Sequence, residues 1–242
     1  MINSIYINLL RYFISIVDLK NKLKIKNFFT KIYKKKEIVI FDIGAHRGET
    51  INFFLKSFQI KKIFAFEPNY DVYSTINKKF AKDKKIEIYN IGLGDNEYEK
   101  NLKVFNESSS STFTQLNKDS KYFKRKNKIL NFFLKEEDQI QNKMVKVISL
   151  NKFIKEKNIE NIDILKIDTE GFEFKILKGL SNDDFLKINF IYFEHHYDLM
   201  LEKNYTYSQI KELLEKHNFV KVYKIKMSFR KTFEYIYENK RF

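Results

Sequence analysis

Short apolar runs alternate with amphipathic segments along most of this 242-residue chain. Runs rich in β-branched and aromatic residues are typical of strands buried on both faces of a sheet. They occupy residues 38–41, 62–66, 86–91, 144–148, 162–167 and 188–193. Apolar residues at helical spacing predict helices over 49–58, 70–80, 150–157 and 207–217, and one that ends near 177 before a glycine. This succession predicts an α/β fold with a parallel, doubly wound sheet.

Both ends of the chain and one internal region depart from that rhythm. Residues 219–225 and 232–237 alternate apolar and polar positions, which predicts a C-terminal antiparallel hairpin. Residues 96–142 contain a predicted strand at 102–105 and then a polar and aromatic stretch without a clear period. We interpret 96–142 as a cap or lid, with a disordered loop as the alternative. The chain divides into an N-terminal segment, 1–36, and a single domain, 37–242.

The N-terminal segment is apolar and aromatic over residues 2–17 and then rich in lysine. The apolar run is too short to span a bilayer and lacks the features of a signal peptide. One interpretation is one or two helices that pack on the domain. The other is an interfacial segment beside an anionic leaflet, which makes peripheral membrane association a candidate property.

Composition narrows the function classes. The absence of cysteine excludes disulfides, thiolate metal sites and a cysteine nucleophile, and a cytoplasmic location is the default. The net charge of +15 suggests nucleic acid as a partner. However, nearly all of this charge is lysine, and the abundance of Lys, Asn, Ile, Phe and Tyr resembles the codon bias of an AT-rich genome. Nucleic acid is therefore disfavoured as a partner, and the oligomeric state is not indicated.

The sequence from residue 38 to residue 58 predicts a strand, a glycine turn and a helix. Asp42, Gly44 and Gly48 lie in the turn. Such a unit presents a helix N-terminus to a ligand, and Gly44 can adopt a positive φ that lets the backbone approach that ligand closely. The spacing Asp-x-Gly-x-x-x-Gly differs from the Gly-x-Gly-x-x-Gly that holds a pyrophosphate, which argues against a dehydrogenase.

Acidic residues and histidines follow the predicted strands. They are Asp42, Glu67, Asp95, Asp168, Glu170, Glu194 and His195. Ligands of open α/β sheets bind beyond the carboxyl ends of the strands. The co-location of these groups therefore favours an enzyme over a scaffold.

The same stretches resemble a known family. DIGAHRG is similar to the first motif of class I S-adenosylmethionine (SAM)-dependent methyltransferases. The order DIGAHRG, FEPN, NIGLGD, VISLNKFI, KIDTEGFE and FEHH resembles the FkbM family, with KIDTEGFE as its most specific mark. The resemblance implies a Rossmann-like class I methyltransferase fold with a seven-stranded, mostly parallel sheet, and O-methyl transfer, often onto sugars. His46 and Asn151 stand where the family often has Asn and Asp; the first departure affects SAM contacts, and the second is a helix cap in either form.

The resemblance assigns a set of cofactor-binding positions for SAM. They are Asp42, Gly44, Ala45, His46, Gly48, Glu67, Pro68, Asn69, Gly94, Asp95 and Asp168. Glu67 would accept two hydrogen bonds from the ribose diol, and Asp42 would orient the turn or the ammonium group of the ligand. Asp95 would accept from the adenine amino group, or would only form a turn.

Transfer of a methyl group to a hydroxyl requires alignment and a base. The candidates are His195, Asp168 and Glu170, and the pKa of an ordinary histidine favours His195. The alternative is a divalent cation held by Asp168, Glu194 and His195, although we predict no metal. Residues 109–112 either line the acceptor pocket or belong to a flexible polar loop.

The leading hypothesis is therefore an O-methyltransferase acting on a hydroxyl of a carbohydrate or glycoconjugate, with a small-molecule or glycan acceptor. An RNA methyltransferase is the second reading, favoured by charge. The IDTEG sequence lacks the Asn/Asp-Pro-Pro-aromatic signature of amino methylation. A non-catalytic nucleotide-binding module of the same fold is the third.

Overall fold

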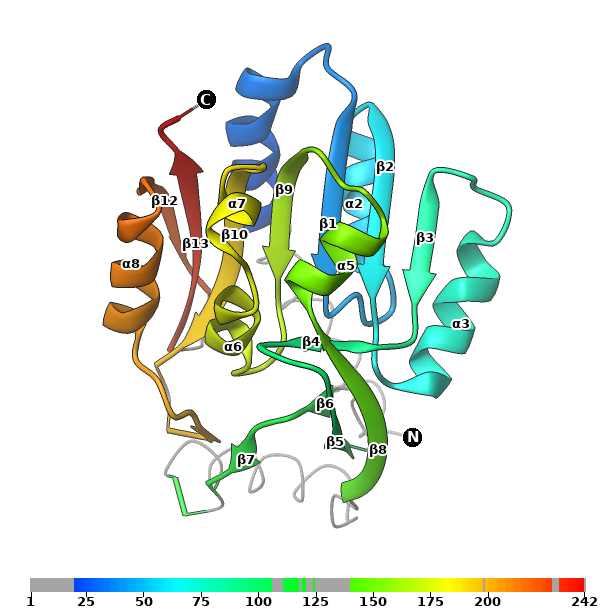
Figure 1. Cartoon of the computed structure of the whole chain (residues 1–242), viewed down its shortest axis with the longest axis vertical. Coiled ribbons are helices and arrows are strands. Elements are labelled where there is room, and N and C mark those ends of the chain that lie inside the picture. The colour runs from blue at the N-terminus through cyan, green and yellow to red at the C-terminus, as the bar shows by residue number, and fades with distance from the viewer. Residues whose placement is uncertain are drawn as a thin grey trace, which may run out of the picture.

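The computed structural model describes residues 20–105, 111–117, 119–120, 124, 140–197, 199–227 and 231–241. The central sheet has the strand order β12-β13-β10-β9-β1-β2-β3 (Figure 1). Its strands are β1 (Ile38–Ile43), β2 (Ile60–Phe66), β3 (Ile86–Tyr89), β9 (Ile162–Ile167), β10 (Ile188–His196), β12 (Phe219–Lys226) and β13 (Thr232–Asn239). Neighbouring strands from β3 to β10 are parallel, and β13 is antiparallel to both β10 and β12. The predicted seven-stranded sheet and its C-terminal hairpin are confirmed.

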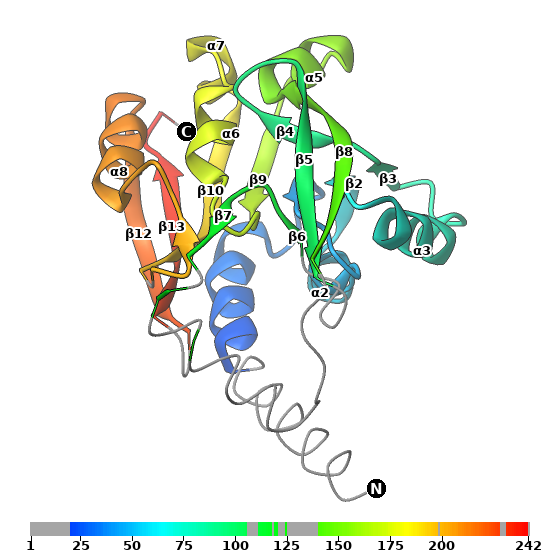
Figure 2. The ribbon, with the colours of Figure 1, turned by 90° about the horizontal axis from the view of Figure 1, so that it is seen from below.

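Helices cover both faces of this sheet (Figure 2). The helix of residues 20–33, α2 (Glu49–Ser57) and α3 (Tyr70–Phe80) pack on one face. The other face carries α5 (Leu150–Glu156), α6 (Glu173–Lys178), α7 (Asn182–Phe185) and α8 (Tyr207–Lys216). Successive side chains of a strand point to opposite faces, so Ile40 of β1 joins the first core and Phe41 joins the second.

The helix of residues 20–33 belongs to the domain because its apolar side is buried. Ile25, Phe29 and Tyr33 are at most 3% exposed and pack against the core beside α2. This part of the N-terminal segment thus packs on the domain, as in the first of our two interpretations, whereas residues 2–17 lie outside the described residues. Among the helices of the described residues, none has both the length and the apolar character needed to span a bilayer.

A second sheet crosses the end of the first. Its order is β4 (Gly92–Gly94), β8 (Ile140–Ser149), β5 (Tyr98–Phe105) and β6 (Ser111–Thr112), and a separate ladder joins β7 (Gln115–Leu116) to β11 (Leu201–Glu202). Residues 92–94 form a strand of this second sheet. One expectation is corrected here: the strand predicted at 144–148 belongs to the second sheet, not to the central sheet. The reason is that β5 and β8 satisfy each other's backbone groups over eight residue pairs, so neither joins the central sheet.

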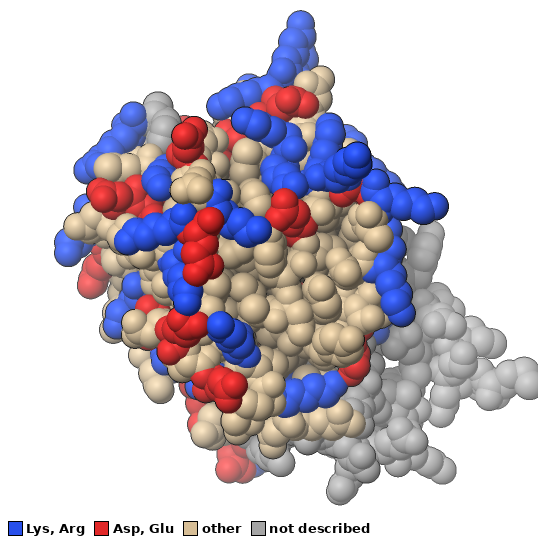
Figure 3. Space-filling view, turned by 45° about the vertical axis from the view of Figure 1, so that its right-hand side comes forward, with Lys and Arg blue, Asp and Glu red and all other residues tan. Residues whose placement is uncertain are grey.

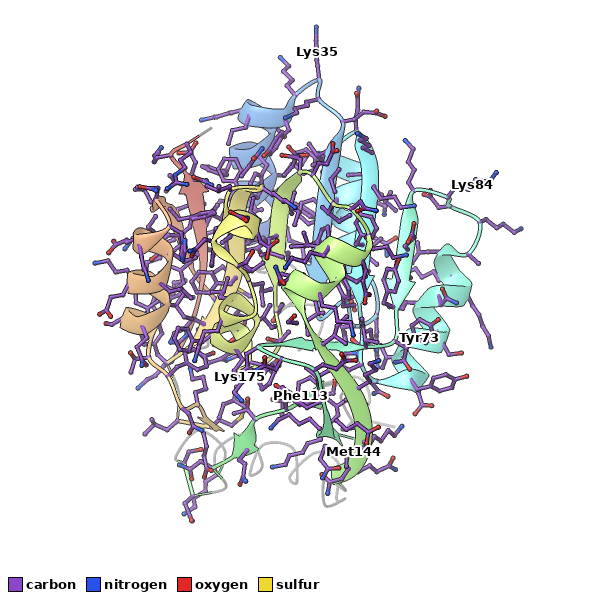
Figure 4. All side chains as sticks on the ribbon, in the orientation of Figure 1. Lys35, Tyr73, Lys84, Phe113, Met144 and Lys175 are labelled. Atoms are coloured by element: carbon purple, nitrogen blue, oxygen red, sulfur yellow. The ribbon has the colours of Figure 1, made fainter. Side chains whose placement is uncertain are left out.

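The two sheets define where a ligand can bind. The carboxyl ends of β1, β2, β9 and β10 all point toward the second sheet (Figure 1). Phe113 and Met144 lie at this end of the molecule, whereas Lys35 and Lys84 project from the opposite end (Figure 4). The crevice at a carboxyl edge, here covered by a second sheet, is the position expected for a ligand site in an α/β fold.

Candidate active site

A cavity of about 450 Å³ lies at this carboxyl edge. Its wall combines the loop after β1, the ends of β2, β9, β10 and β13, part of the second sheet, and the start of the helix of residues 20–33. Carboxylates dominate its charged lining: Glu49, Glu67, Asp168, Glu170, Glu194 and Glu234. Lys22, Lys166 and His46 are the basic side chains in the same wall.

The loop between β1 and α2 depends on two glycines. Gly44 has φ +85°, and a Cβ there would lie 1.9 Å from the carbonyl oxygen of Asp168. Gly48 has φ +75° at the N-terminus of α2, where a Cβ would lie 2.7 Å from the ring of Phe80. The amides of Gly44 and Ala45 both donate to the carbonyl of Phe66 at 3.0 Å. The close approach that requires glycine at position 44 is therefore an approach of the loop to β9, which fixes one wall of the cavity.

Glu67 ends β2 and lies under the same loop. Its Oε2 accepts from the amide of His46 and its Oε1 from the amide of Asn69, both at 2.9 Å. The side chain is buried, and burial raises the pKa of Glu67 above its ordinary value. Because a carboxylate oxygen has two lone pairs, each oxygen can accept one further hydrogen bond from a ligand. Glu67 and Pro68 line the cavity, whereas Asn69 caps α3 by accepting from the amide of Asp71 at 3.3 Å.

The loop after β9 carries the most specific sequence motif. Asp168, Thr169 and Glu170 line the cavity, and Glu170 adopts the left-handed region with φ +51°. Glu173 fixes the conformation of this loop, because its Oε1 accepts hydrogen bonds from the amides of Thr169 at 3.3 Å and Gly171 at 3.0 Å. Glu173, the final acidic residue of KIDTEGFE, therefore has a structural role.

A buried lysine lies beside this loop. Lys166, 3% exposed, donates to Oδ2 of Asp168 at 2.9 Å and places its Nζ 4.9 Å from the ring centre of Tyr192. Burial alone would lower the pKa of Lys166, but the carboxylates of Asp168 and Glu234 raise it above its ordinary value. Lys166 is therefore a permanent cation in this wall.

The far end of the cavity is acidic. Nε2 of His196 lies 3.1 Å from Oε2 of Glu170 and 3.3 Å from Oε1 of Glu194, and Nδ1 of His196 lies 3.1 Å from Oγ1 of Thr232. Burial, followed by repulsion from Asp168, raises the pKa of Glu194 well above its ordinary value. A carboxylate with a raised pKa is a stronger base than an ordinary one.

His195 does not line this cavity. It points from the opposite side of β10 and packs against the rings of Tyr197, Tyr205 and Tyr207 at 4.8–5.9 Å between centroids. Burial lowers the pKa of His195 to about 3, and its Nδ1 has no hydrogen-bond partner among the described residues. The structure thus does not support our assignment of His195 as the base, because alternation along β10 directs Glu194 to the cavity side and His195 away from it.

Asp42, Gly48 and Asn69 lie beside the cavity without lining it, and two further predicted cofactor residues belong to the second sheet and the turn after it. Gly94 ends β4 in the second sheet, where a Cβ would meet Tyr98, Val147 and Phe172. Asp95 follows it and accepts from the hydroxyl of Tyr98 at 3.1 Å. Neither residue lines the cavity. The role in adenine binding that we expected for Asp95 is therefore not supported, because the chain leaves the central sheet after β3.

The structure also bears on the metal and acceptor hypotheses. The described ranges contain no group of three or more His, Cys, Asp or Glu side chains arranged to hold a metal ion. The three proposed metal ligands do not lie together, since His195 lies across the sheet from Asp168 and Glu194.

Ser111 and Thr112 line the cavity, and Thr112 Oγ1 donates to the carbonyl of Glu170 at 2.7 Å. Residues 109 and 110 lie outside the described residues.

Four lining or supporting residues were not singled out from the sequence: Lys166, Tyr192, His196 and Glu234. Lys166 could have been identified from the sequence, because it is a lysine inside the apolar run IDILKI. A charged residue in a strand that is buried on both faces requires partners. Glu234 had no such signal, since an acidic residue in a terminal hairpin is usually exposed.

Comparison with known proteins places this geometry in context. The family model described as "Methyltransferase FkbM domain" matches residues 42–221. The structure of a methyltransferase FkbM from Methylobacillus flagellatus KT aligns with a TM-score of 0.51 and 14% identity, covering 83% of this chain and 44% of that one. The chain thus spans less than half the length of that protein. At this identity the likeness shows the fold alone.

Weaker likenesses include TrmK from M. capricolum in complex with S-adenosyl-homocysteine (SAH), with a TM-score of 0.47, 14% identity, and 87% and 67% of the two chains covered. Magnesium protoporphyrin IX methyltransferase from Synechocystis PCC 6803 with bound SAM has a TM-score of 0.46, 7% identity, and 92% and 79% covered. A comparison with curated proteins gives no match.

Proposed function

Because the chain belongs to the FkbM methyltransferase family, we propose that it is a SAM-dependent O-methyltransferase whose acceptor is a hydroxyl of a carbohydrate or glycoconjugate. The observation that carries this proposal is the cavity itself. It combines a backbone-held carboxylate at the end of β2 with a cluster of carboxylates at the ends of β9, β10 and β13. The carboxylate at the end of β2 can accept hydrogen bonds from a nucleoside ribose. The carboxylate cluster can attract a cation that lies beside an acceptor hydroxyl.

The residues present fit SAM. Glu67 can accept from a ribose diol while it keeps its two backbone hydrogen bonds. Both oxygens of Asp42, which is 1% exposed, lack a hydrogen-bond partner among the described residues, and Asp42 lies near Lys166, Asp168, Glu49 and Glu67. A volume of about 450 Å³ lies in the range of small-molecule sites. The loop of Gly44, Ala45 and His46 would support the ligand between these acids.

The proposed reaction is an in-line displacement. Bound SAM would supply a methyl group on a sulfonium, whose S–C bond would break as the C–O bond to the acceptor forms, with SAH as the neutral thioether product. We assign Glu194 as the base that takes the hydroxyl proton. Burial raises the pKa of Glu194, whereas Oδ2 of Asp168 accepts a hydrogen bond from the ammonium of Lys166 at 2.9 Å. His196 orients Glu194 through the contact at Oε1.

The charge of the cavity supports a neutral acceptor. The chain carries a net charge of +15, yet six carboxylates and two lysines line the cavity. Carboxylates accept hydrogen bonds from sugar hydroxyls and repel phosphates. On the face in Figure 3, lysines and arginines are scattered among acidic side chains instead of forming one basic surface. Both observations weigh against RNA, the candidate that the net charge favours.

We also propose that the reaction takes place in the cytoplasm, in peripheral contact with a membrane. The cysteine-free composition is compatible with the cytoplasm. The lysines of the helix of residues 20–33 support peripheral contact with an anionic membrane, and Lys22 of this helix also lines the cavity. Such contact would bring the cavity close to glycans carried on lipids.

Methyl transfer from labelled SAM tests the proposal. Purified protein is incubated with SAM labelled in the methyl group and with either cell-envelope oligosaccharides or total RNA. We expect label in material that periodate or glycosidases degrade and that ribonuclease leaves intact. The Glu67→Ala variant serves as the control and should transfer little label at the same SAM concentration. Label that ribonuclease releases would favour the RNA reading, and no label in either pool would contradict the proposed acceptor class.

A further inference from the structure

Lys166, Glu194 and Glu234 line the acidic end of the cavity, and Asp42 lies beside Lys166 in the same layer of side chains. In the register of the central sheet, Lys166 of β9 stands opposite Asp42 of β1 on one side and Tyr192 of β10 on the other. The next pair along the sheet is Glu194 of β10 opposite Glu234 of β13. Directly opposed residues have Cβ atoms about 4.5–5.5 Å apart. Two glutamates are therefore held side by side against the cavity, with Tyr192 donating a hydrogen bond to Oε1 of Glu234.

Carboxyl groups outnumber basic groups in this layer. Lys166 interacts electrostatically with Asp42, Asp168, Glu194 and Glu234. Its ammonium makes a close ion pair with Asp168 at 2.9 Å. Burial raises the pKa of Asp42 to about 7, and that of Glu194 well above its ordinary range. A further cation beside these carboxyl groups would stabilise their ionised forms.

Asp42 gives independent evidence for a missing cationic partner. Its side chain is 1% exposed, and neither carboxylate oxygen has a hydrogen-bond partner among the described residues. Buried carboxylates are normally paired or hydrogen-bonded. Asp42 lies within electrostatic range of Glu67, at the proposed ribose end, and of Asp168, at the acidic end. A cation held between those two ends, either the ammonium or the sulfonium of SAM, would be close to it.

We propose that this carboxylate layer recognises the positive charge of the sulfonium, so that the protein binds SAM more tightly than SAH. The inference rests on the proposed function, because it assumes that SAM occupies this cavity. SAM and SAH share every group except the transferred methyl and the charge on sulfur. The attraction between the sulfonium and the layer is lost when the methyl group leaves. Product release is then favoured by the reaction itself, and SAH is a weak inhibitor.

Calorimetric titration with three ligands tests the proposal without an acceptor. The ligands are SAM, SAH and sinefungin, in which a carbon bearing a protonated amine replaces the sulfonium. We expect SAM and sinefungin to bind at least about tenfold more tightly than SAH at low ionic strength. Sinefungin separates the effect of charge from contacts made by the methyl group.

Two isosteric variants locate the effect. Glu234→Gln removes one charge from the layer and should bring the SAM and SAH affinities closer together while leaving that of SAH within about twofold of wild type. Glu49→Gln is the matched control: Glu49 lines the same cavity, but its side chain is 52% exposed and pairs with His46. Water screens a charge at that position, so this variant should preserve the preference for SAM.

The outcomes distinguish the inference from the proposed function. Equal affinities for the three ligands would overturn charge recognition while leaving a SAM site in place. An unchanged preference in Glu234→Gln would also overturn it, because the preference would then arise outside the layer. Failure of all three ligands to bind would contradict the proposed function itself and the inference with it.

Discussion

Replacing Glu194 by Gln is expected to lower turnover by about 10²–10⁴-fold, the usual contribution of a general base. Gln keeps the shape of the side chain but cannot take the proton of the acceptor hydroxyl. Glu194 lines the cavity, and burial raises the pKa of its carboxyl, which makes it a stronger base than a carboxylate of ordinary pKa. The measurement is the initial rate of labelled methyl transfer at saturating SAM, once an acceptor from the oligosaccharide pool is in hand.

The predicted role of Glu194 also fixes the direction in which turnover changes with pH. Below the raised pKa of Glu194 the carboxyl is protonated and cannot act as a base, so wild-type turnover should increase as pH rises through that pKa and then level off. The Gln variant should lack this rise.

His195→Gln is the matched control for this test. It alters the neighbouring residue of the same strand on the side away from the cavity, and it should keep turnover within a few-fold of wild type. A Glu194→Gln variant with nearly full activity, beside an inactive Glu170→Gln variant, would transfer the role of base to Glu170.

Replacing Gly44 by Ala is expected to abolish measurable SAM binding and to destabilise the domain. The added Cβ would lie 1.9 Å from the carbonyl oxygen of Asp168, and the backbone at φ +85° disfavours any L side chain. The loop must then move away from β9, at a cost of about 3–5 kcal/mol. For a domain of this size that cost lowers the melting temperature by about 10 °C. Circular dichroism measures the unfolding, and calorimetry well below the transition measures SAM affinity.

Gly179→Ala separates loss of stability from loss of the site. A Cβ at Gly179 would lie 2.0 Å from the carbonyl oxygen of Gly94, a clash of the same kind at a position that does not line the cavity. This variant should melt at a lower temperature and yet bind SAM with nearly wild-type affinity when folded. A Gly44→Ala variant that binds SAM as wild type does would contradict the role of the loop.

Much of the fold follows from local pattern. Residues 162–167 form a strand with the predicted bounds, and residues 70–80 form the predicted helix. These two predictions are correct because strong apolar periodicity, the cap at Asn69 and tertiary burial all favour the same secondary structure. The second sheet was not predictable in the same way, because β5 and β8 pair across more than 30 intervening residues, and nothing local encodes that partner.

The predicted end of each strand determined which site residues were assigned correctly. Glu67 and Asp168 reach the cavity because each directly follows a strand whose end was correctly predicted, and Glu170 lies in the same loop as Asp168. We ended the strand before Glu194 at residue 193, whereas β10 continues to His196. Alternation over those last three residues places Glu194 and His196 on one face and His195 on the other. The burial of Lys166 and Glu234 arises from contacts between strands far apart in the sequence.

Titration of the purified protein with SAM tests the central claim most directly, because that claim is that the cavity between Glu67 and Glu194 binds this ligand. The prediction is a single site per chain with micromolar affinity, no detectable binding of NAD, and a loss of about 1.5–3 kcal/mol in Glu67→Ala, the scale of hydrogen bonds to a charged group. Thermal unfolding in parallel shows that the variant is folded. No heat with SAM from folded wild-type protein, or equal SAM affinity in wild type and Glu67→Ala, would contradict the account.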